Sequence, residues 1–240
     1  SVHVPLVIRG AIGRSWGQGA QHSQAFHSFF MHIPGLKVVA PSLPSDAKGS
    51  IIAAIRDNNP VVFVEHRMLY NIEEHVSEIP YISEIGKARV LQQGNDITIV
   101  GISHMVIEVL RAHKHLESNG ISAEIIDPIW LSPLDVDTIA ASVEKTGRLL
   151  VVDTGWLPCG ASAEIAMQVI ERLQGQKNII VERVGYAETP CPTTKPLENL
   201  FYPNSTTIAS QAYKMIYPNS LPWTPNGEEA EEITKFKGPF

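Results

Sequence analysis

Cysteine is scarce in this sequence, with two residues among 240. Cys159 and Cys191 lie far apart, and neither belongs to a CxxC pair. This scarcity excludes a disulfide-stapled fold, and no His/Cys spacing is that of a zinc site. The pattern predicts a protein of a reducing cytoplasm in which both thiols are structural.

Long apolar runs and a surplus of positive charge are absent as well. No run approaches the ~20 residues that cross a bilayer, so a membrane protein is not expected. The formal net charge of −6 argues against nucleic acid or an anionic membrane as the main partner. With 44% apolar and 18% charged residues, the composition is that of a globular chain with one large domain or two smaller ones.

The glycine-rich stretch of residues 10–19 (GAIGRSWGQG) contains neither GxGxxG nor GxxxxGK[ST]. It therefore predicts no dinucleotide fingerprint and no P-loop, and its glycines let the backbone turn sharply or approach a neighbour. It follows residues 3–10, which predict a buried strand. A strand so early has two interpretations. The other strands of its sheet come from another polypeptide or a removed segment, or the chain begins with an ordinary edge or central strand.

Strands and helices then alternate along the chain, which predicts βαβ units and a mostly parallel sheet with helices on both faces. Residues 66–85 show no clear period and predict a surface linker. We therefore expect two α/β units joined near residue 80, followed by an extended tail over residues 217–240. The expected strands are residues 36–40, 61–65, 96–102, 123–126, 149–153 and 179–184, and the expected helices are residues 23–32, the segment from Ser45 to Asp57, and residues 104–118, 135–144, 162–173 and 206–216.

His22 is the first candidate for chemistry. It lies in the tetrapeptide QHSQ, between the glycine-rich stretch and the predicted helix over residues 23–32. In open α/β sheets ligands bind in such loops, and a histidine there serves as an acid or base near neutral pH. The alternative is a histidine at a helix N-terminus that bonds to the backbone. The other histidines, and the pair Asp153 and Glu164, show no spacing that points to a site, and we interpret the histidines as structural or surface residues.

The segment of residues 54–59 (AIRDNN) ends a helix and is the second candidate. Its exposed carbonyl groups carry partial negative charge and Asp57 adds an anionic oxygen, so this end can coordinate a hard cation. The alternative is an ordinary helix end with an asparagine in the left-handed conformation. The same helix is predicted to bury Ile51, Ile52 and Ile55 in the core.

Several stretches together resemble one family. The run from PLVIRG through GAQHSQAFHSFFMHIPGLKVVAPSLPSDAKGSIIAAIRDNNPVVFVEHRMLY is similar to the pyrimidine-binding domain of 2-oxoacid dehydrogenase E1 β subunits. The later segments DITIVGIS, SAEIIDPIWLSPLD, LLVVDTGWLPCGASAEI and PLENLFYPNS resemble the transketolase-type C-terminal domain of the same family. The resemblance covers nearly all of the chain, and QHSQ with HIPGLKVVAPS and AIRDNNPV is a specific combination.

The resemblance implies an α/β fold class: part of a pyrimidine-binding domain over residues 1–80, a three-layer α/β/α C-terminal domain over residues 81–216, and the tail over residues 217–240. It also implies that His22 lines the active-site channel and takes part in proton transfer during reductive acylation of the lipoyl group. The family holds a structural potassium ion largely by backbone carbonyl groups. The matching positions here are Leu6, Ala54, Ile55, Asp57 and Asn59.

The cofactor implied by the resemblance is thiamine diphosphate with magnesium. In the family, a glutamate of the β subunit activates the thiamine, and the α subunit binds the diphosphate and magnesium. No segment here resembles the one that carries this glutamate, so we expect no cofactor-binding residue in this chain and no activity from the chain alone. The implied partners are an E1 α subunit, a chain that supplies the N-terminal β segment, a second β copy and the lipoyl acyltransferase E2. The expected function is decarboxylation of a 2-oxoacid with acyl transfer to E2.

Two alternatives remain at this stage. The chain is a noncatalytic assembly or docking subunit of such a complex, or it is a relative with transketolase or deoxyxylulose-phosphate synthase activity. QHSQ and AIRDNNPV favour the dehydrogenase branch. The sequence leaves open the choice among pyruvate, branched-chain oxoacids and acetoin.

Overall fold

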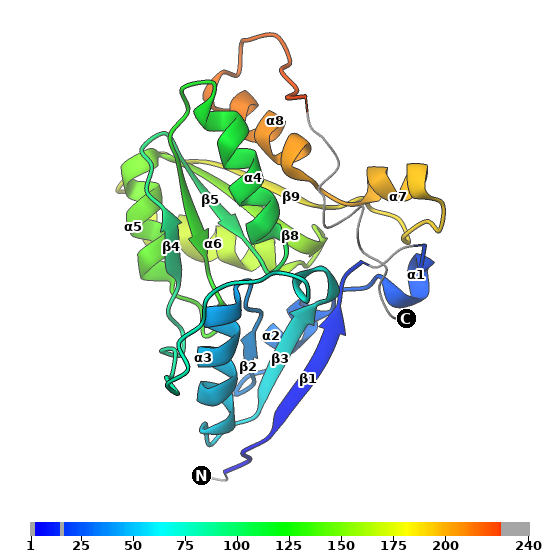
Figure 1. Ribbon diagram of the computed structural model, residues 1–240. Helices are drawn as coiled ribbons and strands as arrows, with labels where there is room; N and C mark the ends of the chain where they lie inside the picture. The colour runs from blue at the N-terminus through cyan, green and yellow to red at the C-terminus, as the bar shows by residue number, and fades with distance from the viewer. Residues whose placement is uncertain (1–2, 15–16, 227–240) are drawn as a thin grey trace.

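The computed structural model describes residues 3–14 and 17–226, which form two α/β units in contact (Figure 1). The first unit contains a four-stranded sheet in the order β1-β3-β2-β7, and its strands β1, β3 and β2 are parallel. Its elements are β1 (Val7–Ile12), α1 (Gly19–His22), α2 (His27–Met31), β2 (Lys37–Val39), α3 (Pro44–Ile55), β3 (Val61–His66) and the 3-10 helix η1 (Arg67–Leu69).

The second unit contains a five-stranded sheet in the order β4-β6-β5-β8-β9, which is parallel except for β4 at its edge. Helices α5 and α6 pack on one face and α4 and α8 on the other, so the predicted three-layer α/β/α arrangement is confirmed. Its elements are β4 (Arg89–Gln92), β5 (Ile97–Gly101), α4 (Met105–Glu117), β6 (Ala123–Asp127), α5 (Val136–Thr146), β8 (Arg148–Trp156), α6 (Ala161–Leu173), β9 (Ile180–Tyr186), α7 (Lys195–Phe201) and α8 (Ser205–Ile216).

One strand of the first sheet comes from the later part of the chain. Strand β7 (Trp130–Ser132) follows β6 and pairs antiparallel with β2. The Trp130 side chain is fully buried and packs in a cluster with Val61 and Phe63 of β3. The first sheet therefore contains a strand from the later part of the chain, and this arrangement buries the large apolar side chain of Trp130.

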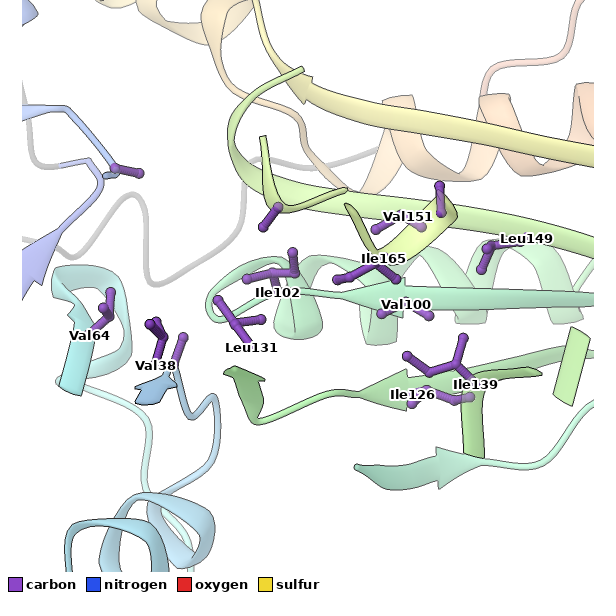
Figure 2. Packing of buried hydrophobic residues seen from close by; sticks show 14 of the residues in the cluster. Val38, Val64, Val100, Ile102, Ile126, Leu131, Ile139, Leu149, Val151 and Ile165 are labelled. Atoms are coloured by element: carbon purple, nitrogen blue, oxygen red, sulfur yellow. The ribbon is translucent and has the colours of Figure 1, made fainter. Parts of the chain in front are cut away.

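The main hydrophobic core also runs across both units. Figure 2 shows Val38 and Val64 of the first sheet together with Val100 and Val151 of the second. Ile102, at the end of β5, lies between the two groups in this view. Because buried apolar contacts join the two sheets, the shared core holds the two units against each other in the folded protein.

Two predictions about helices are wrong. Residues 23–32 do not form one helix, because α1 ends before Ser23 and α2 begins at His27, and both of these residues are buried. In α3, Ile55 is 64% exposed, whereas Ala53 and Ala54 are buried. The buried face of this helix also carries small residues because it packs closely: a Cβ on Gly49 would lie 2.0 Å from Ser83 Oγ.

The tail is ordered in its described part. Trp223 packs its ring 4.8 Å from that of Tyr213 on α8. Residues 227–240, which the sequence predicts as part of the same extended tail, lie outside the described residues. Among the described residues, no helix combines the length and apolarity needed to cross a membrane.

Candidate functional site

The carboxyl ends of β1 and β3 lie side by side, since Ile12 is the register partner of His66. This edge of a parallel sheet is where open α/β proteins bind ligands. The loops that leave it contain α1 with His22, and η1 with Arg67. The first candidate site is therefore built from the ends of two neighbouring strands.

Gly13 lets these two loops approach each other. It has a φ of +77°, in the left-handed region, and a Cβ at this position would lie 1.9 Å from His66 Nε2. Only glycine leaves room for the histidine ring beneath the loop. On its other side the ring accepts a hydrogen bond at Nδ1 from the backbone N–H of Met68, 3.2 Å away, and so caps η1.

His22 is the last residue of α1, and its side chain is exposed. The sequence placed it just before a helix, whereas the structure places it at the end of a short one. The main chain of His22 is anchored, because its carbonyl oxygen accepts a hydrogen bond of 2.8 Å from Arg67 Nη1. The backbone is therefore fixed while the imidazole stays accessible to a ligand.

A cavity of about 500 Å³ opens beside this motif. Its walls include Ala20, Ser23 and Gln24 from around His22, together with Trp156 from the second unit. The Trp156 indole is held by its N–H, which donates to Thr189 O at 3.2 Å. The cavity is mostly apolar, so it suits an uncharged, apolar group close to the QHSQ segment, although His22 itself does not line it.

Two histidines that the sequence left unassigned are stacked beneath the site. The rings of His66 and His104 lie 4.7 Å apart with an angle of 13° between them, and His104 precedes α4 of the second unit. Burial, followed by the nearby positive charges of Arg14 and Arg111, lowers the pKa of His104 to about 3. Burial and the neighbouring His104 lower the pKa of His66 well below its usual value. Both rings are therefore uncharged at neutral pH.

His27 and Asp153 form a buried pair across the two units. His27 Nε2 lies 2.9 Å from Asp153 Oδ1, and the two side chains are 1% and 0% exposed. The other carboxylate oxygen of Asp153 accepts from the backbone N–H of Ser162, in the first turn of α6, at 3.0 Å. The sequence predicts His27 to be a structural or surface residue but does not reveal this pair, because its partner is 126 positions away and only folding brings them together.

The predicted cation positions also come together, at the opposite end of the strands. The Leu6 carbonyl accepts from Val61 N at 2.8 Å, which places it beside the start of β3, and Asn58 accepts from Val4 N at 2.9 Å. Helix α3 ends at Ile55 in the same corner. The structure thus gathers Leu6, Ala54, Ile55, Asp57 and Asn59 at the amino ends of β1 and β3.

The Asp57 carboxylate in this corner is already engaged. Oδ1 accepts from Asn59 N at 2.7 Å, and Oδ2 contacts the Lys37 ammonium group. Although burial raises the pKa of Asp57, hydrogen bonds from Lys37 and Asn59 lower it below its usual value. A cation here would therefore meet carbonyl oxygens rather than this carboxylate. The described part of the chain contains no cluster of three or more His, Cys, Asp or Glu side chains that could hold a metal.

Comparison with known proteins identifies the two units. Residues 86–208 match the family described as transketolase, C-terminal domain, and residues 1–73 match the transketolase, pyrimidine binding domain. The chain is 45% identical over 210 residues to the acetoin:2,6-dichlorophenolindophenol oxidoreductase subunit beta of Cupriavidus necator, covering 88% of this chain and 62% of that protein. It is 41% identical over 220 residues to the pyruvate dehydrogenase E1 component subunit beta of Rickettsia bellii, covering 90% and 66%.

Solved structures show the same fold. A split gene transketolase, described as an inactive beta4 tetramer, matches with a TM-score of 0.73 at 22% identity, covering 90% of this chain and 67% of that one. A transketolase from Pichia stipitis matches with a TM-score of 0.60 at 16% identity, covering 90% and 30%. The chain spans 62% and 66% of the lengths of the two curated relatives named above.

Proposed function

Because the chain belongs to the family that joins a transketolase-type pyrimidine-binding domain to a transketolase C-terminal domain, we propose that it serves as the E1 β component of a 2-oxoacid dehydrogenase. The similar proteins of Cupriavidus necator and Rickettsia bellii are β subunits of an acetoin oxidoreductase and of pyruvate dehydrogenase. The observation that carries the proposal is the accessible imidazole of His22 on an anchored backbone, at the carboxyl edge of a parallel sheet.

The cofactor of this proposal is thiamine diphosphate, which when bound supplies the electron-accepting chemistry that decarboxylation requires. The described residues fit one wall of such a site, because His22 is exposed and its chain neighbours Ala20, Ser23 and Gln24 line a mostly apolar cavity. For the diphosphate and magnesium, no group of three or more His, Cys, Asp or Glu side chains that could hold a metal occurs in the described part of the chain. We assign those groups, and the glutamate that activates the thiamine, to residues outside the 240 of this sequence.

His22 acts in this proposal as the group that gives or takes a proton at its ring nitrogens while the acyl group passes to the lipoyl sulfur of E2. Imidazole suits this step because it exchanges protons near neutral pH. The mostly apolar walls of the cavity beside the QHSQ segment offer a surface on which an apolar group can lie. The remaining partners of the proposal are an E1 α subunit, a second β copy and E2.

The test is turnover of the reconstituted complex. The chain is combined with an E1 α subunit, the glutamate-bearing β segment and a lipoyl domain, and 2-oxoacid-dependent acylation of the lipoyl group is measured. His22→Ala should lower the rate by about 10²- to 10⁴-fold, the usual contribution of a general acid or base. His3→Ala is the matched control, because this histidine is also exposed and precedes β1, at the end of that strand opposite the site.

Two results would contradict the proposal. Unchanged acylation by the His22→Ala complex would remove the histidine from the chemistry. An intact complex that decarboxylates none of pyruvate, branched-chain oxoacids or acetoin would instead indicate a noncatalytic assembly subunit.

A further inference from the structure

Arg67 links the two loops that form the candidate active site. It is the first residue of η1, directly after β3. Its Nη1 donates one hydrogen bond to the carbonyl of Gly13 and another to the carbonyl of His22, each 2.8 Å long. A single guanidinium nitrogen therefore ties the end of β1 and the end of α1 to the end of β3.

The His22 carbonyl needs such a donor. It belongs to the last residue of α1, and the last carbonyl groups of a helix have no partner within that helix. With four residues, α1 is too short to hold its own geometry. Its start is fixed by the close approach of Gly19 to Thr193, where a Cβ would lie 2.7 Å from Cγ2. Its end is fixed by Arg67.

The position of Arg67 depends in turn on the contacts of its neighbour His66. The His66 ring caps η1 by accepting a hydrogen bond from the backbone N–H of Met68, and Gly13 lies against the same ring. His104 of the second unit stacks on the same ring. Contacts thus run from the second unit through His104 and His66 to Arg67, and from Arg67 to the main chain of His22.

We propose that Arg67 is a positioning residue, which sets the orientation of His22 by holding its carbonyl oxygen and that of Gly13. The inference rests on the proposed function, since it assumes that His22 takes part in the reaction. Arg67 itself makes no contact with substrate in this scheme. Its effect on turnover passes through His22 alone.

A double-mutant cycle in the reconstituted complex tests this. Arg67→Ala should lower the rate of lipoyl acylation on the order of 10- to 100-fold, the cost of misplacing a catalytic group by about 1 Å, and leave KM for the 2-oxoacid unchanged. In a His22→Ala background the same change should lower the rate less than twofold, because coupled residues are not additive. Arg67→Lys should restore part of the rate, since an ammonium group can still donate to one of the carbonyls.

A second readout does not depend on turnover. In the full chain, the imidazole signals of His22 in an NMR spectrum should shift or broaden in Arg67→Ala. Arg172→Ala is the matched control, because the Arg172 guanidinium is also held by a partner, but it lies exposed on α6 in an ion pair with Asp137. It should leave both the His22 signals and the acylation rate unchanged.

The outcomes separate the two ideas. If His22→Ala lowers the rate and Arg67→Ala does not, the positioning role is wrong and the proposed function stands. Equal losses from Arg67→Ala in both backgrounds would show a general structural role and would also overturn the inference. If His22→Ala has no effect, the proposed function itself fails.

Discussion

Asp127 is a carboxyl group whose pKa is raised by burial. It ends β6, just before the strand that joins the two sheets, and it is 0% exposed. Oδ1 accepts from the backbone N–H of Ile129 at 2.8 Å, and Oδ2 is contacted by the Ser42 hydroxyl. Burial raises its pKa from 3.8 to about 7, against the lowering effect of these hydrogen bonds.

The sign of the pH dependence follows from this rise. The unfolded chain loses the Asp127 proton near pH 3.8, whereas the folded chain keeps it up to about pH 7. The contribution of Asp127 to the unfolding free energy therefore falls as the pH rises between these two values and is constant above them. A shift of about three units corresponds to roughly 4 kcal/mol of unfolding free energy once both states are ionised.

Asp127→Asn removes this dependence while keeping an oxygen for Ile129 and a polar group for Ser42. The unfolding free energy of the variant minus that of the native protein should rise by about 3 kcal/mol from pH 4.5 to pH 8, measured by urea denaturation. Asp137→Asn serves as the control, because that carboxylate is 76% exposed. A difference between Asp127→Asn and the native protein that stays the same at both pH values would refute the reasoning.

Two further predictions concern the junction of the units and the predicted cation corner. Asp153→Ala should lower the unfolding free energy by about 3–5 kcal/mol, because it leaves His27 and Ser162 N without their buried partner. A loss below about 1 kcal/mol in urea denaturation would contradict this prediction. Potassium chloride should raise the melting temperature above its value in sodium chloride of equal ionic strength, because a cation bound only by the folded state stabilises that state. This gain should be lost in Asp57→Ala, because the substitution removes the hydrogen bonds that shape the turn at Asn59. Equal melting temperatures in the two salts would argue against the cation site.

Much of the fold could be predicted from local patterns. The alternation of strands and helices predicted β5, α4, β6, α5, β8 and α6 close to their observed positions, because the helices have a 3.6-residue apolar period and the strands are short apolar runs between them. Strands β4 and β7 were missed. They are four and three residues long, too short for a period, and both are defined by pairing with strands elsewhere in the chain.

Local sequence motifs likewise revealed some residues of the candidate site and not others. The sequence singled out His22 because QHSQ follows a glycine-rich stretch, and it singled out the end of α3 because carbonyl groups are unpaired there. Arg67 carried no comparable signal. Its importance depends on two carbonyl groups 54 and 45 positions away, which it reaches only when β1 and β3 lie side by side.

The sequence by itself determined the family, the order of its two α/β units and the residue types available for chemistry, because these depend on periodicity and on local motifs. The tertiary structure alone decided which of those residues meet. It broke the expected helix over residues 23–32 to bury His27 against Asp153, and it stacked His66 on His104. Contacts between distant parts of the chain form only on folding, when apolar burial brings the two sheets together around one core.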